Sequence, residues 1–193
     1  MAWRALASGL ALGATLLLPL AIGRPAAALD EVLILSRYRS YTGANMLPRR
    51  NGHPAVDFAE QLGAPVLAAA DGVVSHLIES RGGCGLGVVI EHTGFDRWTV
   101  YCHMRAVWVD PGQLVSRGEQ IGQVGNSGST SETPHVHLEL CTTLCDSHAD
   151  GDFADTEDPL AIAEGCYEAE RAYPSDRLVL TFPVPCLRWV RWR

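Results

Sequence analysis

The chain has 193 residues, a length that fits one domain or one domain with an extension. Its formal net charge is -7 at pH 7, and because Arg4 and Arg24 precede the first acidic residue, Asp30, the rest of the chain is more acidic still. Binding to a nucleic-acid backbone depends on clustered Lys and Arg, so the composition argues against nucleic acid as a partner.

The first 28 residues predict a secretory signal peptide. A short basic start that ends at Arg4 precedes an apolar run over residues 5–22, and Ala26-Ala27-Ala28 offers a small-residue cleavage site. We expect the mature chain to begin near Leu29, to be periplasmic or secreted, and to keep no stable insertion in a membrane. An uncleaved membrane anchor is the alternative, because the apolar run is just long enough for one.

The six cysteines all follow the predicted cleavage site, so disulfide bonds in an oxidising compartment are expected. Six cysteines allow many pairings, and the sequence does not choose among them. We suggest Cys141 with Cys145, which enclose a short loop, and Cys166 with Cys186, which would hold the C-terminal end in place. A zinc site made of cysteines is the rival interpretation, but Cys141 and Cys145 have no matching second pair.

Short apolar segments separated by Gly and Pro indicate β-strands along most of the chain. The expected strands cover residues 32–35, 56–58, 65–68, 73–78, 88–92, 98–103 and 135–140. Asp71-Gly72 between two such segments predicts a hairpin. No segment of this part shows a convincing 3.6-residue period, so the fold class is mainly β, an antiparallel sheet or sandwich.

The composition changes after Cys145, where a polar loop, helical turns over residues 158–164 and a late strand over residues 178–182 are expected. We therefore divide the chain into a signal peptide (1–28), an N-terminal lead-in (29–52), a core domain (53–145) and a short cysteine-containing C-terminal extension (146–193). The lead-in is expected to be a polar, arginine-rich loop that delivers the chain to His53.

Residues 135–140 carry two histidines on an alternating strand. Side chains along a strand point to opposite faces in turn, so His135, His137 and Glu139 share one face while three apolar side chains share the other. This spacing suits one metal ligand beside a second group that handles protons. An exposed histidine pair on a half-buried strand is the alternative.

His53 and Asp57 offer two further ligand atoms, provided that the chain bends near Pro54. In a straight strand they would lie about 13 Å apart, too far for one ion. Together with His137 they would form the nitrogen, nitrogen and oxygen set of a catalytic zinc site that keeps one position open for water. His135, by strand parity, and His103, at the end of the strand over residues 98–103, are candidates for the neighbouring proton carrier.

The motifs His53-x-x-x-Asp57, Tyr101-Cys102-His103-Met104, Gly125-Asn126-Ser127-Gly128 and His135-Val136-His137 together resemble the lysostaphin-type (LytM-type) zinc metallopeptidases, which cut peptide bridges in bacterial peptidoglycan. The resemblance covers roughly residues 53–140. It implies that His53, Asp57 and His137 bind Zn²⁺, that His103 and His135 are catalytic, and that an open groove lies over the metal. Ala55 departs from the usual Gly, and Cys102 beside His103 is expected to be a disulfide half or a core residue.

This resemblance predicts an exported endopeptidase that hydrolyses peptide bonds of peptidoglycan through a zinc-activated water. Asn126 and Ser127 are weaker candidates for substrate contacts, and a regulatory protein partner stays unidentified. The alternative is a non-catalytic envelope protein of the same fold that binds peptidoglycan or activates another hydrolase. A cysteine hydrolase that uses Cys102 with His103 is a third interpretation, disfavoured because adjacent strand residues point apart.

The remaining histidines are interpreted as structural or ordinary groups. His76 and His148 lack a partner motif and are expected at the surface or in loops, and His92 is expected to make a structural hydrogen bond. Glu139 shares the face of the histidine pair, where it either orients a ligand or is solvated.

Overall fold

The computed structural model describes residues 32–128 and 133–186. The predicted signal peptide lies outside this part, as do residues 129–132 of the loop before His135. Within the described ranges, no helix is long and apolar enough to cross a membrane.

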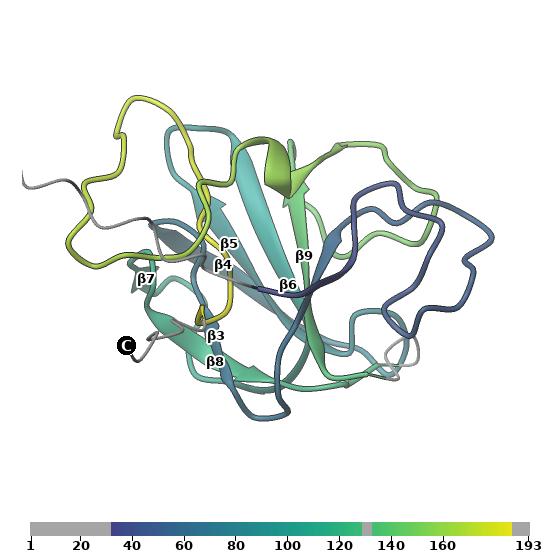
Figure 1. The fold of residues 1–193 in the computed structure, drawn as a ribbon. Coiled ribbons are helices and arrows are strands. Elements are labelled where there is room, and N and C mark those ends of the chain that lie inside the picture. Colours follow the sequence, from purple (N-terminus) through teal and green to yellow (C-terminus); the bar gives the residue numbers. More distant parts are fainter. Residues whose placement is uncertain (1–31, 129–132, 187–193) are drawn as a thin grey trace, which may run out of the picture.

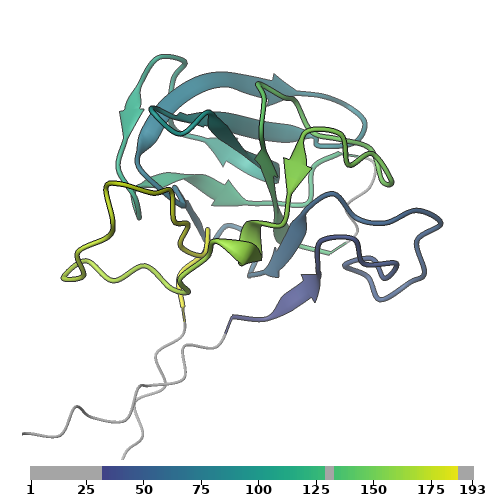
Figure 2. The same ribbon diagram turned by 90° about the horizontal axis from the view of Figure 1, so that it is seen from above.

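The described chain folds around one antiparallel β-sheet (Figures 1 and 2). Its main path runs β1-β2-β9-β6-β5-β4-β7, with β10 paired to β9 and with β8 paired to both β3 and β6. The strands are β1 (Ile34–Ser36), β2 (Val56–Ala59), β3 (Pro65–Leu67), β4 (Gly72–Glu79), β5 (Leu86–His92), β6 (Arg97–Val107), β7 (Leu114–Val115), β8 (Gln120–Val124), β9 (His135–Cys141) and β10 (Thr156–Glu157). The expected mainly β fold with antiparallel pairing is confirmed.

The main core lies on one face of the sheet, and the alternation of β9 explains why. Val136, Leu138 and Leu140 are buried there against residues of β2 and β6 such as Phe58 and Tyr101. Burying one such side chain contributes about 1.5–3 kcal/mol to folding. A smaller cluster with Val89 and Val100 lies apart from this core. The predicted division of β9 into a core face and a histidine face is confirmed.

The hairpin predicted at Asp71-Gly72 is wrong. β3 pairs with β8 and not with β4, while β4 pairs with β5 and β7. Gly72 is needed for a different reason than a turn, because a Cβ there would lie 2.4 Å from the carbonyl oxygen of Glu91 on the neighbouring strand. The carboxylate of Asp71 accepts a hydrogen bond from the Arg117 amide at 2.7 Å, which fixes this corner to the segment after β7.

The C-terminal extension packs on the same core. It contains β10 and a short 3₁₀ helix, η1 (Pro159–Ala161), where helical turns were expected. The strand predicted over residues 178–182 is wrong, because this segment makes only an isolated bridge between Leu180 and Ala163. Its amides donate in turn to different segments: that of Leu180 to the Ile162 carbonyl, that of Thr181 to the Ala69 carbonyl and that of Phe182 to the Gly165 carbonyl.

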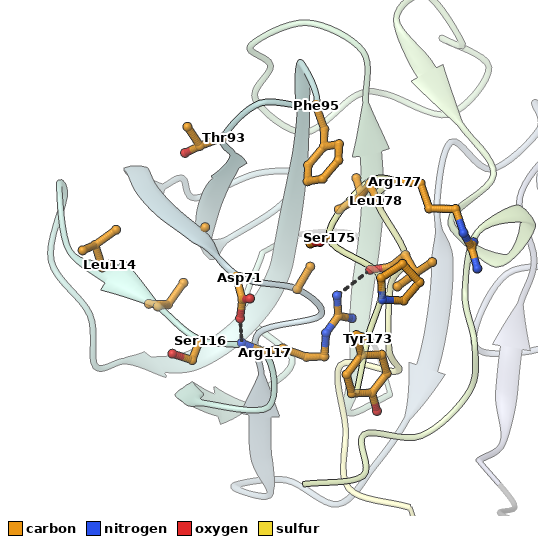
Figure 3. A pocket seen from close by; sticks show the side chains of 15 residues that line it. Asp71, Thr93, Phe95, Leu114, Ser116, Arg117, Tyr173, Ser175, Arg177 and Leu178 are labelled. Carbon is orange, nitrogen blue, oxygen red and sulfur yellow. Dashed lines mark hydrogen bonds between the residues drawn. The ribbon is translucent and has the colours of Figure 1, made fainter. Parts of the chain in front are cut away.

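Arg117 connects this extension to the rest of the sheet (Figure 3). Its guanidinium donates to the carbonyls of Ala69 and Val179 at 2.6 and 2.9 Å, and it lies 4.3 Å from the ring centre of Tyr173. The pocket in Figure 3, of about 590 Å³, lies between this extension and the corner that contains Asp71.

Three disulfides link the six cysteines: Cys84–Cys102, Cys141–Cys145 and Cys166–Cys186. Both suggested pairs are therefore confirmed, and Cys102 is a buried disulfide half as expected. Cys84–Cys102 ties the turn before β5 to β6 directly beside His103.

Candidate metal centre

The structure brings together the five histidine and aspartate residues that the sequence singled out. Asp57 on β2 pairs directly with His137 on β9, so their side chains lie on the same face of the sheet. His135 lies two residues earlier on β9, His53 lies in the loop before β2, and His103 lies on β6. All are buried, with His137 the most exposed at 7%.

Three atoms of this group form a nearly equilateral triangle. Nε2 of His53 lies 3.0 Å from Nδ1 of His137, and Oδ1 of Asp57 lies 3.2 Å from each of these nitrogens. Ligands at about 2.0–2.1 Å from a tetrahedral zinc ion lie roughly 3.3 Å from one another. The triangle thus has the size of one face of a zinc tetrahedron, and its nitrogen, nitrogen and oxygen donors are those that zinc accepts.

His53 is held in the tautomer that a metal requires. Its Nδ1 lies 3.1 Å from Oγ of Ser36, and the Ser36 hydroxyl donates its proton to the Thr42 carbonyl at 2.7 Å. The serine oxygen can therefore only accept from Nδ1–H. This leaves a lone pair on Nε2 of His53, the nitrogen in the triangle.

His137 is held in the same manner by a carboxylate. Its Nε2 lies 2.9 Å from Oε1 of Glu139, two residues along the same face of β9. Burial alone would raise the pKa of Glu139. Hydrogen bonds from His137, His148 and Ser147 outweigh burial and lower this pKa to about 2, so Glu139 is ionised. The proton of His137 then belongs on Nε2, and Nδ1 offers its lone pair to the centre of the triangle.

Asp57 uses its two oxygens differently. Oδ1 belongs to the triangle, while Oδ2 accepts a hydrogen bond from Arg49 at 3.2 Å. Arg49 also donates to Asp150 at 2.6 Å, so it bridges the lead-in, β2 and the loop after β9. This arrangement favours a single oxygen of Asp57 as the ligand.

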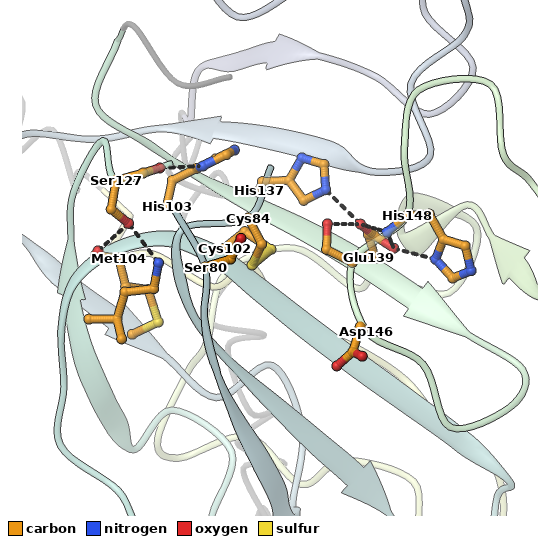
Figure 4. The surroundings of a disulfide bond; sticks show 12 residues. Ser80, Cys84, Cys102, His103, Met104, Ser127, His137, Glu139, Asp146 and His148 are labelled. Atoms are coloured by element: carbon orange, nitrogen blue, oxygen red, sulfur yellow. Dashed lines mark hydrogen bonds and ion pairs between the residues drawn. A yellow bond between two sulfur atoms is a disulfide. The ribbon is translucent and has the colours of Figure 1, made fainter. Parts of the chain in front are cut away.

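His103 reaches the site through an unusual backbone conformation. Its φ is +64°, in the left-handed region, at the point where β6 leaves β9 and begins to pair with β8. Its Nδ1 donates to the carbonyl of Ser127 at 2.9 Å (Figure 4), which leaves the Nε2 lone pair available. The ring centre lies 4.7 Å from that of His135 and 5.5 Å from that of His137.

His135 has a matching arrangement. Its Nδ1 donates to the carbonyl of Thr133 at 2.6 Å, and its Nε2 lies 3.5 Å from Oδ1 of Asp57. His103 and His135 therefore both present an Nε2 lone pair, from two different strands, beside the triangle of ligand atoms.

The electrostatics of the site favour a cation at the triangle and neutral rings beside it. Burial opposes a charge on Asp57, but the neighbouring rings of His137 and His53 outweigh it and hold the pKa of Asp57 well below its usual range. Burial likewise opposes a charge on His137, yet the neighbouring carboxylates of Asp57 and Glu139 raise its pKa to about 9, which shows that this position favours positive charge. Burial, with His137 and His135 nearby, lowers the pKa of His103 to about 3.

Sequence reasoning missed three contributors to the site: Ser36, Arg49 and His148. Ser36 ends β1 and Arg49 lies in the loop that follows, and the lead-in was expected only to deliver the chain to His53. His148 was expected to be an ordinary loop group, but its ring contacts Glu139. A single serine, arginine or histidine that contacts a residue far away in the sequence carries no periodic signal, so only the folded chain reveals these contacts.

The weaker candidates for substrate contacts lie beside the site. Asn126 is exposed. The Ser127 hydroxyl donates to the Met104 carbonyl at 2.7 Å and accepts from the Leu86 amide at 2.9 Å, so it already serves the protein. A substrate contact of either residue stays a prediction. His92 makes the expected structural hydrogen bonds, to the Asp71 carbonyl at 2.8 Å and to Thr99 at 2.9 Å.

A family model described as Peptidase family M23 matches residues 51–149, half of the chain. The peptidoglycan DD-endopeptidase ShyA of Vibrio cholerae is 42% identical over 88 residues, which are 46% of this chain and 20% of that protein. The chain thus spans about a fifth of the length of the curated relatives that it matches.

Two solved catalytic domains have a similar fold. One is a variant of the prophage-encoded M23 protein EnpA from Enterococcus faecalis, with a TM-score of 0.53, 28% identity and coverage of 66% of this chain and 88% of that chain. The other is the antimicrobial peptidase lysostaphin from Staphylococcus simulans, with a TM-score of 0.51, 25% identity and coverage of 67% of this chain and 87% of that chain.

Proposed function

The chain belongs to peptidase family M23, and from this premise we propose that it is an exported, zinc-dependent endopeptidase that hydrolyses peptide bonds in bacterial peptidoglycan. The observation that carries the proposal is the triangle of His53 Nε2, Asp57 Oδ1 and His137 Nδ1, which matches one face of a zinc tetrahedron. The substrate is inferred from relatives such as ShyA, whose name describes a peptidoglycan DD-endopeptidase.

His53, Asp57 and His137 would hold the ion, with Ser36, Arg49 and Glu139 fixing the direction of each ligand atom. When bound, zinc supplies Lewis-acid chemistry and lowers the pKa of water toward neutrality. His103 and His135 lie beside this arrangement, each with Nδ1–H bound to a backbone carbonyl.

We assign the proton chemistry to the two Nε2 atoms. A neutral imidazole whose Nδ1 proton is fixed can accept a proton from water on Nε2 as a general base. Once protonated, the same ring can donate to the leaving amine or stabilise negative charge on the carbonyl oxygen of the peptide. The structure offers two such rings, so acceptance and stabilisation can be divided between His135 and His103.

The test combines metal analysis with hydrolysis of sacculi. We expect the purified mature protein to hold about one zinc ion per chain, as a single site requires, and to release soluble peptide fragments that mass spectrometry assigns to one type of bond. His137→Ala should lose both zinc and release, whereas His103→Ala should keep zinc and lose release.

A matched control is His76→Ala, because His76 pairs with the exposed Asp146 and with none of the site residues. This variant should hydrolyse sacculi like the unchanged protein. Undiminished release by both His103→Ala and His135→Ala would contradict the assigned mechanism. Zinc binding without any release from sacculi would favour the alternative, a non-catalytic envelope protein that binds peptidoglycan.

Export is part of the proposal and has its own measurement. The pattern over residues 1–28 and the three disulfides support an oxidising compartment. Amino-terminal sequencing of protein from the cell envelope or medium should begin near Leu29, whereas a start at Met1 or Ala2 would contradict cleavage.

A further inference from the structure

The loop that follows β9 turns back onto the strand that carries His137 (Figure 4). β9 ends at Cys141, which forms a disulfide with Cys145, and Ser147 and His148 come directly afterwards. Both of these residues contact the buried carboxylate of Glu139. The loop therefore touches a metal ligand through one intermediate side chain.

Most of the hydrogen bonds that Glu139 accepts come from this loop. Oε1 accepts from the Ser147 hydroxyl at 2.9 Å and from the His148 amide at 3.0 Å, while Oε2 accepts from Nδ1 of His148 at 2.8 Å and from the same amide at 3.2 Å. The remaining bond is the one with Nε2 of His137 at 2.9 Å. His137 is thus held by a carboxylate whose own position depends on Ser147 and His148.

The surroundings make these donors necessary. The side chain of Glu139 is fully buried, and its partner on β6 is Val100, which belongs to an apolar cluster with Cys102 and Cys141. A buried carboxylate that loses donors turns toward groups that can still satisfy it. Such a turn would release Nε2 of His137 and let the ring rotate out of the ligand triangle.

The disulfide sets where the loop begins. Cys141 is fully buried at the end of β9, and Cys145 is partly exposed. The bond between them ties the start of the loop to the same strand that carries His137 and Glu139. Only Asp146 separates Cys145 from Ser147, so the two donors have little freedom while the disulfide is intact.

We propose that Ser147 and His148 are positioning residues for the metal ligand His137, and that the Cys141–Cys145 disulfide keeps them in place, so that zinc retention depends on the oxidation state of this cysteine pair. This inference rests on the proposed zinc site. It adds that zinc retention depends on a disulfide and on two residues that do not contact the ion.

The redox step needs a dithiol reductant. A thiolate of the reductant attacks Sγ of Cys145, the S–S bond breaks, and Cys141 leaves as a thiolate that takes up a proton. The second thiol of the reductant then displaces Cys145 and closes a cyclic disulfide. Two electrons pass from the reductant to the protein, which ends with two thiols.

The experiment measures zinc affinity of the folded mature protein by competition with a chromogenic chelator at fixed pH. Removing a residue that orients a metal ligand typically costs about 10–100-fold in metal affinity. We expect a loss in this range for His148→Ala and a smaller loss for Ser147→Ala. His148→Asn should restore most of the affinity, because the Asn amide can place an N–H where Nδ1 of His148 lies.

The disulfide arm compares two double variants. The Cys141→Ser and Cys145→Ser double variant should have about 10-fold lower zinc affinity than the unchanged protein. Dithiothreitol should no longer change the zinc affinity of this variant. Cys166→Ser with Cys186→Ser is the matched control, because this disulfide lies in the C-terminal extension and contacts none of the site residues. It should retain zinc like the unchanged protein and should still respond to dithiothreitol.

Visible absorption of the Co²⁺-loaded protein gives a readout that a purely structural role would not move. His148→Ala should change the intensity of the cobalt bands while far-UV circular dichroism stays unchanged, and His148→Asn should return the bands. If the Cys141→Ser and Cys145→Ser double variant fails to fold, the zinc affinities and cobalt bands of His148→Ala and His148→Asn test the positioning role.

The outcomes separate this inference from the proposed function. Zinc held by the unchanged protein, with equal affinity in His148→Ala and in the Cys141 and Cys145 double variant, would overturn the positioning role and leave the metal site intact. A protein that holds no zinc in any form would overturn both proposals. Loss in His148→Ala that His148→Asn restores would support the inference.

Discussion

A single backbone angle decides which face of the sheet His103 occupies. Cys102 pairs with His137 on β9, so in a regular strand the next side chain would point into the main core beside Tyr101. The left-handed φ of +64° at His103 interrupts the alternation and directs its ring toward His135 and His137. Backbone strain of this kind is often found at functional sites.

Arg49 determines how Asp57 presents its oxygens, and this leads to a prediction. Arg49→Ala should lower zinc affinity by about 10-fold, because Oδ2 of Asp57 loses its donor and the carboxylate can turn. Arg49→Lys should lose less, since one ammonium can still reach Oδ2. Chelator competition measures both. Arg50→Ala is the control, because this neighbouring side chain is exposed, and equal affinities for all the variants would contradict the role of Arg49.

His92 predicts how stability depends on pH, away from the metal ligands. Burial lowers its pKa from 6.5 to about 4, so the unfolded chain takes up the proton first. Stability that is present above pH 6.5 should fall as the pH decreases toward 4, by up to about 3 kcal/mol from this group. Below pH 4 the contribution should change no further.

The measurement is urea unfolding at pH 7 and pH 5 for the unchanged protein and for His92→Gln, which cannot take up this proton. Taking the difference between the two proteins removes the contributions of the other titrating groups. We expect the unchanged protein to lose more stability between these pH values than the variant. Equal losses would show that His92 does not carry the effect.

At the scale of elements, the sequence predicted what depends on regular alternation. The faces of β9, with His135 and His137 on one of them, followed from strand parity, and the bend between His53 and Asp57 followed from their spacing. The roles of these residues and of His103 came from the resemblance to a known family. The hairpin at Asp71-Gly72 failed because β3 finds its partner in β8, more than 50 residues further along the chain. No local pattern near Asp71 contains that information.

Gly72 gives a prediction at this scale, where β4 and β5 approach closely. Gly72→Ala should destabilise the fold by about 1–3 kcal/mol, because the new Cβ would meet the backbone carbonyl of Glu91, which cannot move aside alone. The midpoint of urea unfolding measures it. Glu91→Ala removes only an exposed side chain and should change stability by less than about 0.5 kcal/mol. Similar midpoints for both variants would contradict the close approach as the cause.

At the scale of the whole molecule, the lead-in and the C-terminal extension share the core of the central sheet. Ile34 from the lead-in and Leu180 and Val184 from the extension pack on the same cluster as Val136 and Leu138. The four-part division of the chain stays a prediction. Its outer parts lack long periodic segments, which is why their packing could not be predicted from the sequence.

The Cys166–Cys186 bond should therefore matter for stability more than for the metal site. It closes a loop with a sequence separation of 20, and a loop of this size corresponds to about 3 kcal/mol in the chain-entropy model. Urea unfolding of Cys166→Ser with Cys186→Ser should show a loss of this order while zinc affinity stays constant. An unchanged midpoint would mean that packing alone holds the extension.

The ends of the main sheet path have a consequence for self-association. The path ends in β1 and β7, which the structure gives as 3 and 2 residues long. Strands this short expose few amide and carbonyl groups to which a second molecule could add a strand, and short edges are a known protection against edge-to-edge aggregation. These two ends therefore offer little backbone to which a strand of a second molecule could pair.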